Sequence, residues 1–322
     1  MSFSKVLITG GAGFIGSHLA EKLVNLGFDV YVYDNLSSGK LENINHLLDR
    51  KNFRFVKEDL LQPKNLPKIL NDCELVFHLA ANPEVKISST NPEIHFQQNL
   101  VSTYNLLECL RKNGNVKTLI FTSSSTVYGE AEIPTPEEYS PLKPISIHGA
   151  VKLACEVLIS AYTRNYGFKS IIYRLANIVG PRSCHGVVVD FVKKLRENSE
   201  ELEILGDGFQ KKSYLYVDDC VNAILQGLNT ANNGDNVKVF NVGSDDQIDV
   251  LTIAKIVVEE MGLKNVKFKP TGGVNGGRGW IGDVKNMLLD ISKLKSIGWK
   301  PTHNSEKAVR LATKFLIKNF KV

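Results

Sequence analysis

Short apolar runs rich in β-branched residues alternate with segments of helical period along the first 180 residues. The runs are nearly continuous in apolar residues, which is typical of parallel strands that are covered on both faces. They lie at 5–10, 29–34, 53–59, 74–81, 118–124 and 170–177, and the helical patterns lie at 14–26, 93–112 and 147–166. This order predicts strand–helix–strand crossovers, and therefore an α/β fold with a doubly wound parallel sheet.

The pattern changes after residue 180, where the turn-rich segment GPRSCHG interrupts it. Helices at 187–198, 218–229, 249–261 and 304–319 then mix with strands at 214–217, 238–242 and 266–270. We expect residues 1–180 to form one domain and residues 181–322 a smaller mixed α/β C-terminal lobe, with chain interchange near the boundary. The lobe would lean on the carboxyl edge of the sheet, where ligands of open α/β sheets bind.

Composition excludes several classes of protein. Of the 322 residues, 43% are hydrophobic and 23% are charged, as in ordinary globular chains. The net charge of +5 is too dilute to indicate nucleic acid as a partner. No apolar run approaches the roughly 18 residues that a membrane span needs. The N-terminus lacks an export signal, and the five Cys are scattered, so we expect a cytoplasmic protein with free thiols. No His or Cys has metal-ligand spacing, so we expect no metal site.

A glycine-rich loop follows the first predicted strand and opens the first predicted helix. The segment TGGAGFIG contains the spacing GxGxxG and also GxxGxxG. Glycine allows a tight turn and a close approach of the backbone to a pyrophosphate, which then meets the free N–H groups of the helix start. The pattern predicts a Rossmann-type dinucleotide-binding domain. The loop residues expected at the cofactor are Gly10, Gly13, Phe14, Ile15 and Gly16.

The second predicted strand ends at a carboxylate, Asp34, 18 residues past the last glycine of the loop. A carboxylate at this point holds ribose hydroxyls and repels a 2′-phosphate, so the sequence favours NAD over NADP. The polar residues that follow, Asn35, Ser38 and Gly39, are also expected at the cofactor.

Two further strand ends contribute candidate cofactor contacts. Asp59, next to Leu60, ends the third predicted strand and is placed either to hold the adenine amine or to cap a helix. Leu79, Ala80 and Ala81 end the fourth strand, where small side chains would let the nicotinamide side of the cofactor pass. Residues of a buried strand would look the same.

Six motifs follow one another along the chain: TGGAGFIGSH, DNLSSG, FHLAA, SSSTVYGE, HGAVKLACE and GDGFQKKSYLYVDD. Together they resemble the extended short-chain dehydrogenase/reductase superfamily over about residues 4 to 320. Within it, the chain is most similar to the NAD-dependent nucleotide-sugar epimerase/dehydratase family, in its UDP-glucose (UDP-galactose) 4-epimerase branch. The resemblance implies NAD as cofactor, a UDP-sugar as substrate, and a homodimer formed through the helices at 93–112 and 147–166.

The resemblance also implies a catalytic set, from which this chain departs at one position. The family uses a Ser or Thr and a Tyr-x-x-x-Lys, which correspond here to Ser124, His148 and Lys152. Three interpretations of His148 stay open: it is the base itself, the chain binds NAD without turnover, or the residue is an engineered change. A neutral imidazole accepts a proton at neutral pH, and the nearby ammonium of Lys152 disfavours its charged form.

Neighbouring residues indicate the type of reaction. The 4,6-dehydratases of the family carry Asp and Glu where this chain has Ser125 and Thr126, and its decarboxylases keep the Glu. An epimerase needs neither, because it oxidises C4 and returns the hydride to the opposite face. By resemblance, Asn99 lines the cofactor site, and Asn177, Lys212 and Arg278 meet the substrate diphosphate.

Overall fold

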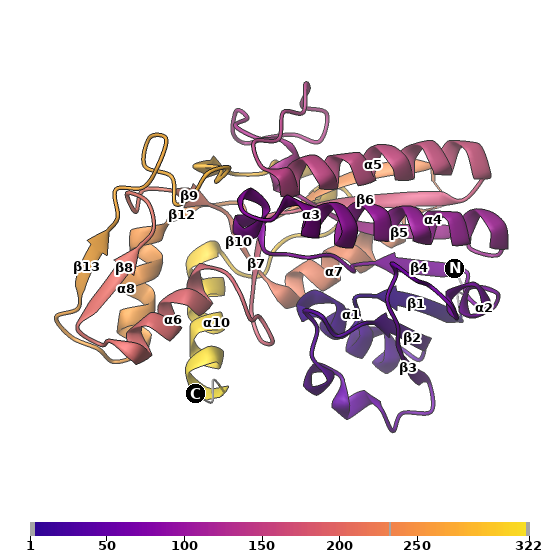
Figure 1. Ribbon diagram of the computed structural model, residues 1–322, viewed down its shortest axis with the longest axis horizontal. Helices are drawn as coiled ribbons and strands as arrows, with labels where there is room; N and C mark the ends of the chain where they lie inside the picture. Colours follow the sequence, from indigo (N-terminus) through magenta and orange to yellow (C-terminus); the bar gives the residue numbers. More distant parts are fainter. Residues whose placement is uncertain (1–3, 232, 320–322) are drawn as a thin grey trace.

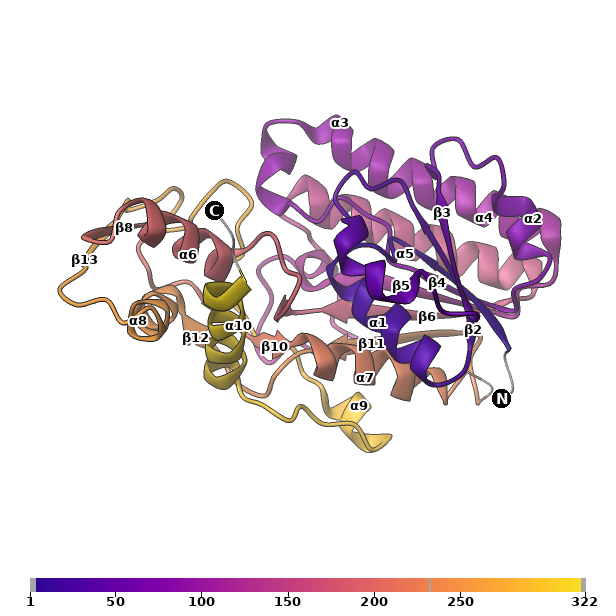
Figure 2. The ribbon, with the colours of Figure 1, turned by 90° about the horizontal axis from the view of Figure 1, so that it is seen from below.

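The computed structural model describes residues 4–231 and 233–319. Its centre is a seven-stranded parallel sheet in the order β11-β6-β5-β4-β1-β2-β3 (Figures 1 and 2). The order reverses between β1 and β4, so the predicted doubly wound α/β fold is confirmed. The strands are β1 (Lys5–Thr9), β2 (Asp29–Asp34), β3 (Phe53–Lys57), β4 (Leu75–His78), β5 (Thr118–Ser124), β6 (Lys169–Leu175) and β11 (Val237–Val242).

Helices cover both faces of this sheet, which explains why its strands are almost wholly apolar (Figure 2). One face packs against α1 (Phe14–Asn25) and α7 (Val217–Leu228). The other packs against α2 (Leu66–Leu70), α4 (Ser102–Asn113) and α5 (Ile147–Tyr166). Each face has its own buried apolar core, and the sheet separates the two.

The helix expected at 93–112 is not uniform. It consists of α3 (Pro92–His95), a π-helical turn (Phe96–Val101) and then α4. A π-helical turn widens the helix and rotates the residues before it relative to those after it. In this chain it lies beside α5, so the side chains of α3 and of the turn meet the start of α5.

The C-terminal lobe is built around a third apolar core. It contains α6 (Val187–Glu197), α8 (Val250–Glu260), α10 (Ser305–Asn319) and the parallel pair β8 (Glu201–Ile204) and β13 (Lys267–Pro270). Two short sheets connect it to the rest of the chain: β7 (Asn177–Val179) with β10 (Tyr214–Tyr216), and β12 (Ile248–Asp249) with β9 (Lys211–Lys212) and β14 (Asn286–Met287).

The strand expected at 238–242 was wrongly placed in the C-terminal lobe. It is β11, which extends the central sheet by pairing in parallel with β6. The helix before it, α7, covers that sheet as well. The chain therefore returns to the central sheet after residue 180, because the apolar run of β11 completes the edge of that sheet. The division into domains at residue 180 stays a prediction.

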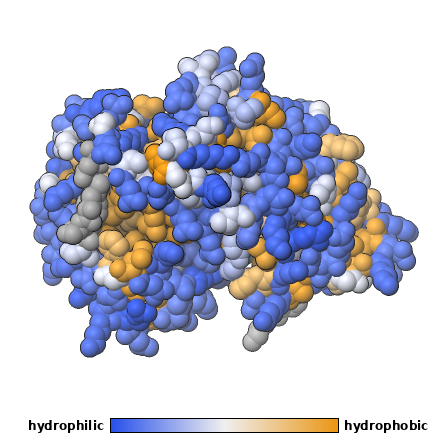
Figure 3. All heavy atoms as spheres, turned by 180° about the vertical axis from the view of Figure 1, so that it is seen from behind, coloured by the Kyte–Doolittle hydropathy of each residue, from blue (hydrophilic) through white to orange (hydrophobic). Residues whose placement is uncertain are grey.

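Short elements complete the described chain: α9 (Ser292–Ser296) and the 3₁₀ turns Leu41–Asn43, Asn45–Leu47, Val85–Ser89 and Ser125–Val127. Seen from behind, the surface is mostly hydrophilic, and its apolar residues gather in several separate patches (Figure 3). No helix among residues 4–231 and 233–319 is long and apolar enough to cross a bilayer.

A buried ion pair fixes α5 against the sheet. Glu156 of α5 accepts hydrogen bonds from Arg174 of β6, with an Nη2–Oε2 distance of 2.8 Å, and both side chains are almost fully buried. Ser123 also donates to Glu156, and Arg174 donates to the hydroxyl of Tyr128 at 2.9 Å. Breaking one partner of such a pair leaves an uncompensated buried charge. The pair thus holds the middle of α5 against β6 and the carboxyl end of β5.

Candidate active site

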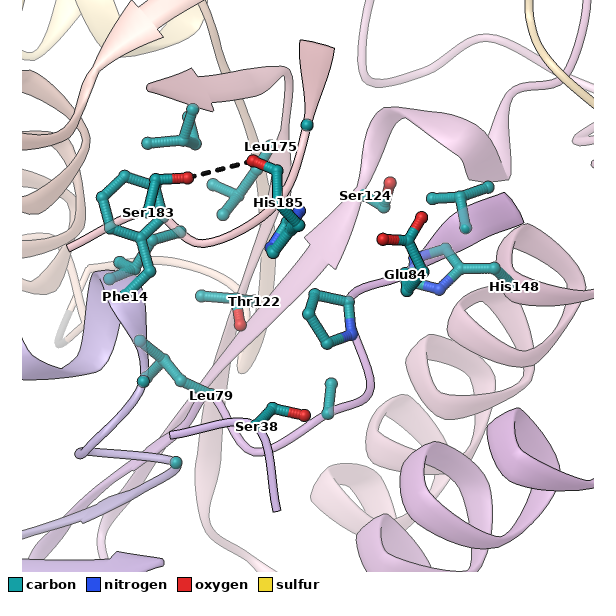
Figure 4. A pocket seen from close by; sticks show the side chains of 18 of the residues that line it. Phe14, Ser38, Leu79, Glu84, Thr122, Ser124, His148, Leu175, Ser183 and His185 are labelled. Carbon is teal, nitrogen blue, oxygen red and sulfur yellow. Dashed lines mark hydrogen bonds between the residues drawn. The ribbon is translucent and has the colours of Figure 1, made fainter. Parts of the chain in front are cut away.

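A cavity of about 440 Å³ lies at the carboxyl ends of the sheet strands, where the strand order reverses. It is lined by the β1–α1 loop, by the ends of β2, β4 and β5, and by the start of α5. Segments 175–189 and 282–284 of the chain close it from the other side. Figure 4 shows side chains from both sides pointing into this space.

The glycine loop packs against the sheet more closely than any side chain would allow. Gly10 has φ +71°, and a Cβ there would lie 2.6 Å from the backbone nitrogen of Ala80. A Cβ at Gly16 would overlap the carbonyl oxygen of Gly10. Gly13 is the N-cap of α1 and offers no side chain to the N–H groups of its first turn. These groups remain available to an anion, and the cradle fits a pyrophosphate.

Two carboxylates are held in place beside the loop. Asp34 accepts hydrogen bonds from the backbone N–H groups of Ala12 at 3.0 Å and Leu36 at 2.8 Å, while burial raises its pKa. Asp59 accepts hydrogen bonds from the side chain of Asn35 at 2.9 Å and from the backbone N–H of Leu61 at 2.8 Å. Each oxygen keeps a lone pair, so both carboxylates are able to accept hydrogen bonds from ribose or adenine.

The start of α5 places two titratable side chains on one face of the helix. Ser146 caps it by accepting a hydrogen bond from the backbone N–H of Gly149 at 3.1 Å. His148 and Lys152 follow one turn apart and are 4% and 5% exposed. Lys152 donates to the carbonyl oxygen of Thr122 at 2.8 Å, and burial lowers its pKa to about 8.

Burial also keeps His148 neutral. It lowers the pKa of this imidazole to about 3, and the positive charge of Lys152 adds to the effect. The dipole at the start of α5 acts in the same direction. The ring contacts His95 edge-on, with 5.1 Å between ring centroids and 3.4 Å between the two Nδ1 atoms. At neutral pH, His148 is therefore an uncharged group with one nitrogen lone pair.

Ser124 lies at the end of β5, and its hydroxyl is oriented by Thr126. The backbone N–H and the hydroxyl of Thr126 both donate to Ser124 Oγ, at 3.2 and 2.9 Å. Its own O–H is then free to donate to a ligand. Figure 4 shows Ser124 and His148 extending into the same part of the cavity from the end of β5 and the start of α5.

The far side of the cavity carries polar atoms without partners. Among the described residues, Asn177 Nδ2 and Trp280 Nε1 are buried side-chain atoms with no hydrogen-bond partner, and both residues line the cavity. Lys212 forms an ion pair with the buried Asp283 and lies over the Trp280 ring, 5.4 Å from its centroid. Buried polar groups are nearly always paired, so these donors indicate the place of a polar ligand.

Two predicted site residues do not line the cavity. Arg278 pairs with Glu130, with 2.8 Å between Nη2 and Oε1, and its guanidinium also donates to the carbonyl oxygen of Asn275. Asn99 is buried behind His148, where it bonds to the backbone of Asn82 and approaches His95. Neither side chain reaches the cavity in this arrangement, and the contacts of Arg278 and Asn99 with ligands stay predictions. All the other predicted cofactor, catalytic and substrate residues line the cavity.

Several cavity residues were not predicted from the sequence: Glu84, Gln98, Ser183, His185 and Trp280. Figure 4 shows Ser183 and His185 facing the cavity, and the Ser183 hydroxyl donates to the His185 carbonyl oxygen at 3.1 Å. Both belong to the segment GPRSCHG, whose composition is typical of a turn. The sequence could have indicated them in one way: polar residues follow directly after a strand end, at the edge of the sheet where ligands bind.

Metal binding has no candidate group in the described chain. Among residues 4–231 and 233–319, no cluster of three or more His, Cys, Asp or Glu side chains is arranged to hold an ion.

Solved structures and curated relatives resemble the chain over almost its whole length. A crystal structure of a UDP-galactose 4-epimerase is 44% identical, with a TM-score of 0.86, over 98% of this chain and 100% of that one. UDP-glucuronic acid 4-epimerase from Bacillus cereus, solved with UDP-glucuronic acid and NAD, is 29% identical, with a TM-score of 0.87, over 98% and 99%. UDP-glucuronic acid decarboxylase 1 of Arabidopsis thaliana is 31% identical over 306 residues, covering 92% of this chain and 66% of the relative.

The family model for the NAD dependent epimerase/dehydratase family matches residues 6–243, which is more than half of the chain. The match contains the glycine loop, Asp34 and the whole of α5, so it covers the features that the sequence and the cavity single out. The resemblance stated from the motifs is confirmed, and NAD is the cofactor that the family description names. The chain belongs to the NAD dependent epimerase/dehydratase family.

Proposed function

We propose that the protein is a UDP-sugar 4-epimerase of the UDP-glucose/UDP-galactose type. The observation that carries this proposal is the cavity itself. It joins the glycine loop to Ser124, His148 and Lys152. Ser125 and Thr126 stand where, by resemblance, the dehydratases of the family carry Asp and Glu and its decarboxylases keep the Glu. The reaction oxidises C4 to a 4-keto sugar, lets the sugar turn over, and reduces C4 from its other face.

The residues present fit NAD at the sheet end of the cavity. The glycine loop would hold the pyrophosphate, and Asp34 would accept hydrogen bonds from the ribose hydroxyls. Leu79, Ala80 and Ala81 line the cavity between this end and α5. When bound, NAD supplies the reversible hydride acceptor that C4 oxidation requires.

The chain itself provides the proton chemistry. His148 is neutral and has a free lone pair, so it can take the proton of the C4 hydroxyl and return it later. Ser124 can donate its hydrogen to the same oxygen and hold the sugar in position. Lys152 carries a buried positive charge that acts on His148 and is held at the carbonyl oxygen of Thr122 on β5, and this charge favours the negative charge that develops on O4.

The diphosphate end is supported by the unpaired donors. Asn177 Nδ2 and Trp280 Nε1 have no partner among the described residues and are placed to donate to the substrate. Lys212 adds little net positive charge to the diphosphate end of the cavity, because it is paired with Asp283. Arg278 would have to break its ion pair with Glu130 to reach a ligand, so we do not assign it a role in substrate binding.

The test is turnover of a panel of UDP-hexoses, UDP-N-acetylhexosamines and UDP-uronates with added NAD. The product is identified by NMR while absorbance in the NADH band is followed. We expect a C4-inverted hexose without accumulation of free NADH. Stoichiometric NADH release would indicate a simple dehydrogenase instead. NAD binding with no change of any sugar would indicate a homologue that has lost catalysis with the tyrosine.

We also propose that the protein forms a homodimer through α4 and α5. The support is a set of exposed apolar side chains on these helices and on the π-helical turn: Phe96, Tyr104, Ile147, Val157 and Tyr166. Val157 is 61% exposed in the middle of α5. Val157→Glu is expected to convert the dimer to monomer in analytical ultracentrifugation, because a charge at the centre of an apolar interface is not solvated. Monomeric parent protein would contradict this proposal.

A further inference from the structure

A chain of hydrogen bonds leads from the backbone to the rear of His148. Asn99 Oδ1 accepts from the backbone N–H of Asn82 at 2.6 Å. Asn99 Nδ2 lies 3.3 Å from the Asn82 carbonyl oxygen and 3.1 Å from His95 Nδ1. His95 Nε2 lies 3.1 Å from the carbonyl oxygen of Glu84, and His95 Nδ1 lies 3.4 Å from His148 Nδ1.

The backbone groups fix the direction of every bond in this chain. A backbone N–H only donates, so Asn99 must turn its oxygen to Asn82 and its NH₂ group to His95. The carbonyl oxygen of Glu84 only accepts, so His95 must carry its hydrogen on Nε2. A neutral imidazole has one N–H, which leaves His95 Nδ1 as an acceptor. The two ends of the chain therefore lead independently to the same tautomer of His95.

The same logic extends to His148. Because His95 Nδ1 has no hydrogen, a hydrogen bond between the two Nδ1 atoms places the hydrogen on His148, and the one lone pair of His95 Nδ1 is then shared between Asn99 Nδ2 and His148 Nδ1. The lone pair of His148 is then on Nε2, for which no hydrogen-bond partner exists among the described residues. His148 lines the cavity, so this nitrogen is available to substrate.

We propose that Asn99 and His95 are positioning residues that hold His148 in the Nδ1–H tautomer, so that Nε2 presents its lone pair to the C4 hydroxyl. This inference rests on the proposed function. The hydroxyl proton passes to Nε2 as C4 is oxidised by the bound nicotinamide dinucleotide, which gives an imidazolium. The same proton returns to O4 when C4 is reduced. In the other tautomer Nε2 carries a hydrogen and accepts nothing.

Asn99→Asp tests the inference with almost no change in shape. One carboxylate oxygen still accepts from the Asn82 N–H, but the other now accepts where the NH₂ group donated. This draws a hydrogen to His95 Nδ1 and favours the Nε2–H form of His148. We expect kcat to fall about tenfold or more while KM for the UDP-sugar changes by less than about threefold.

The control is the same substitution in a His148→Tyr background. A phenol has no tautomers, so Asn99→Asp is expected to cost less than about threefold in kcat there. An equal loss in both backgrounds would mean that Asn99 only supports the fold, and would overturn the inference.

¹⁵N NMR of histidine-labelled protein reads the tautomer without turnover, with His148 assigned by its loss in His148→Tyr. We expect a hydrogen-free Nε2 in the parent, and a mixture of tautomers in His95→Phe, which keeps a ring but no acceptor. A hydrogen-bearing Nε2 in the active parent would overturn the inference and leave the epimerase standing. A hydrogen-free Nε2 in a parent that changes no sugar would contradict the proposed function and leave only the tautomer assignment standing.

Discussion

Lys152→Met is expected to abolish turnover and, at neutral pH, to make the protein more stable. Lys152 is 5% exposed, and burial lowers its pKa from 10.5 to about 8. Removing the positive charge beside O4 should lower kcat at least about 100-fold. The same removal ends the cost of burying that charge, which the pKa shift places at about 3 kcal/mol. The substitution also removes the hydrogen bond to Thr122, which offsets about 1 kcal/mol of this effect. We therefore expect the free energy of unfolding to rise by about 2 kcal/mol.

The stability advantage of Lys152→Met over the parent should shrink as pH rises. Below about pH 8, Lys152 is charged in both the folded and the unfolded chain, so the full cost is present. Between about 8 and 10.5 the folded form has lost its proton and the unfolded form is losing it, so the cost shrinks as pH rises. The advantage of Lys152→Met should therefore be largest at pH 7 and fade toward pH 10.5. The kcat of the parent should fall as pH rises through about 8.

Urea unfolding of the parent and Lys152→Met at several pH values measures this effect. Lys314→Met is the matched control, since Lys314 is 61% exposed, and it should change the free energy of unfolding by less than about 0.5 kcal/mol. A Lys152→Met protein that is less stable than the parent at pH 7, or that turns over normally, would contradict the role given to this residue.

His148→Phe is expected to lower kcat by about 10² to 10⁴, the usual contribution of a positioned general base. His148→Tyr is the matched variant, because it differs from His148→Phe by one hydroxyl group. The pKa of His148, about 3, makes the imidazole a weak base, whereas a phenol beside the Lys152 ammonium is a stronger one once ionised. We therefore expect His148→Tyr to match or exceed the parent.

Steady-state kinetics of the three proteins, with NAD affinity measured in parallel, makes the comparison. Equal NAD affinity in all three would show that the variants change the proton step alone. Normal turnover by His148→Phe would place the base elsewhere in the cavity. If the parent is inactive and His148→Tyr is active, the chain has kept the fold and the NAD site but has lost the proton transfer.

The sequence predicted the sheet well because continuous apolar strands and helical segments alternate with clear boundaries. The helix expected at 147–166 matches α5 at both ends, where Ser146 caps it and Gly167 ends it. The position of β11 was not predictable in this way. An apolar strand looks the same whether it joins the large sheet or a small one, and only its pairing with β6 decides.

The site shows a similar division. The glycine loop, Asp34 and the Ser124–His148–Lys152 set follow from local motifs, and the fold brings them to one cavity. The contact between His95 and His148 joins residues 53 positions apart and depends on the π-helical turn, which no period in the sequence indicates. Arg278 has the right residue type, but Glu130, far away in the chain, pairs with it.

The central claim is that C4 is oxidised and reduced within one binding event. NMR of the product formed from UDP-glucose deuterated at C4, in ordinary water with NAD, tests it most directly. The account predicts UDP-galactose that keeps the deuterium at C4 and no free NADH. Inverted product that has lost its deuterium to solvent, or UDP-glucose recovered unchanged, would contradict it.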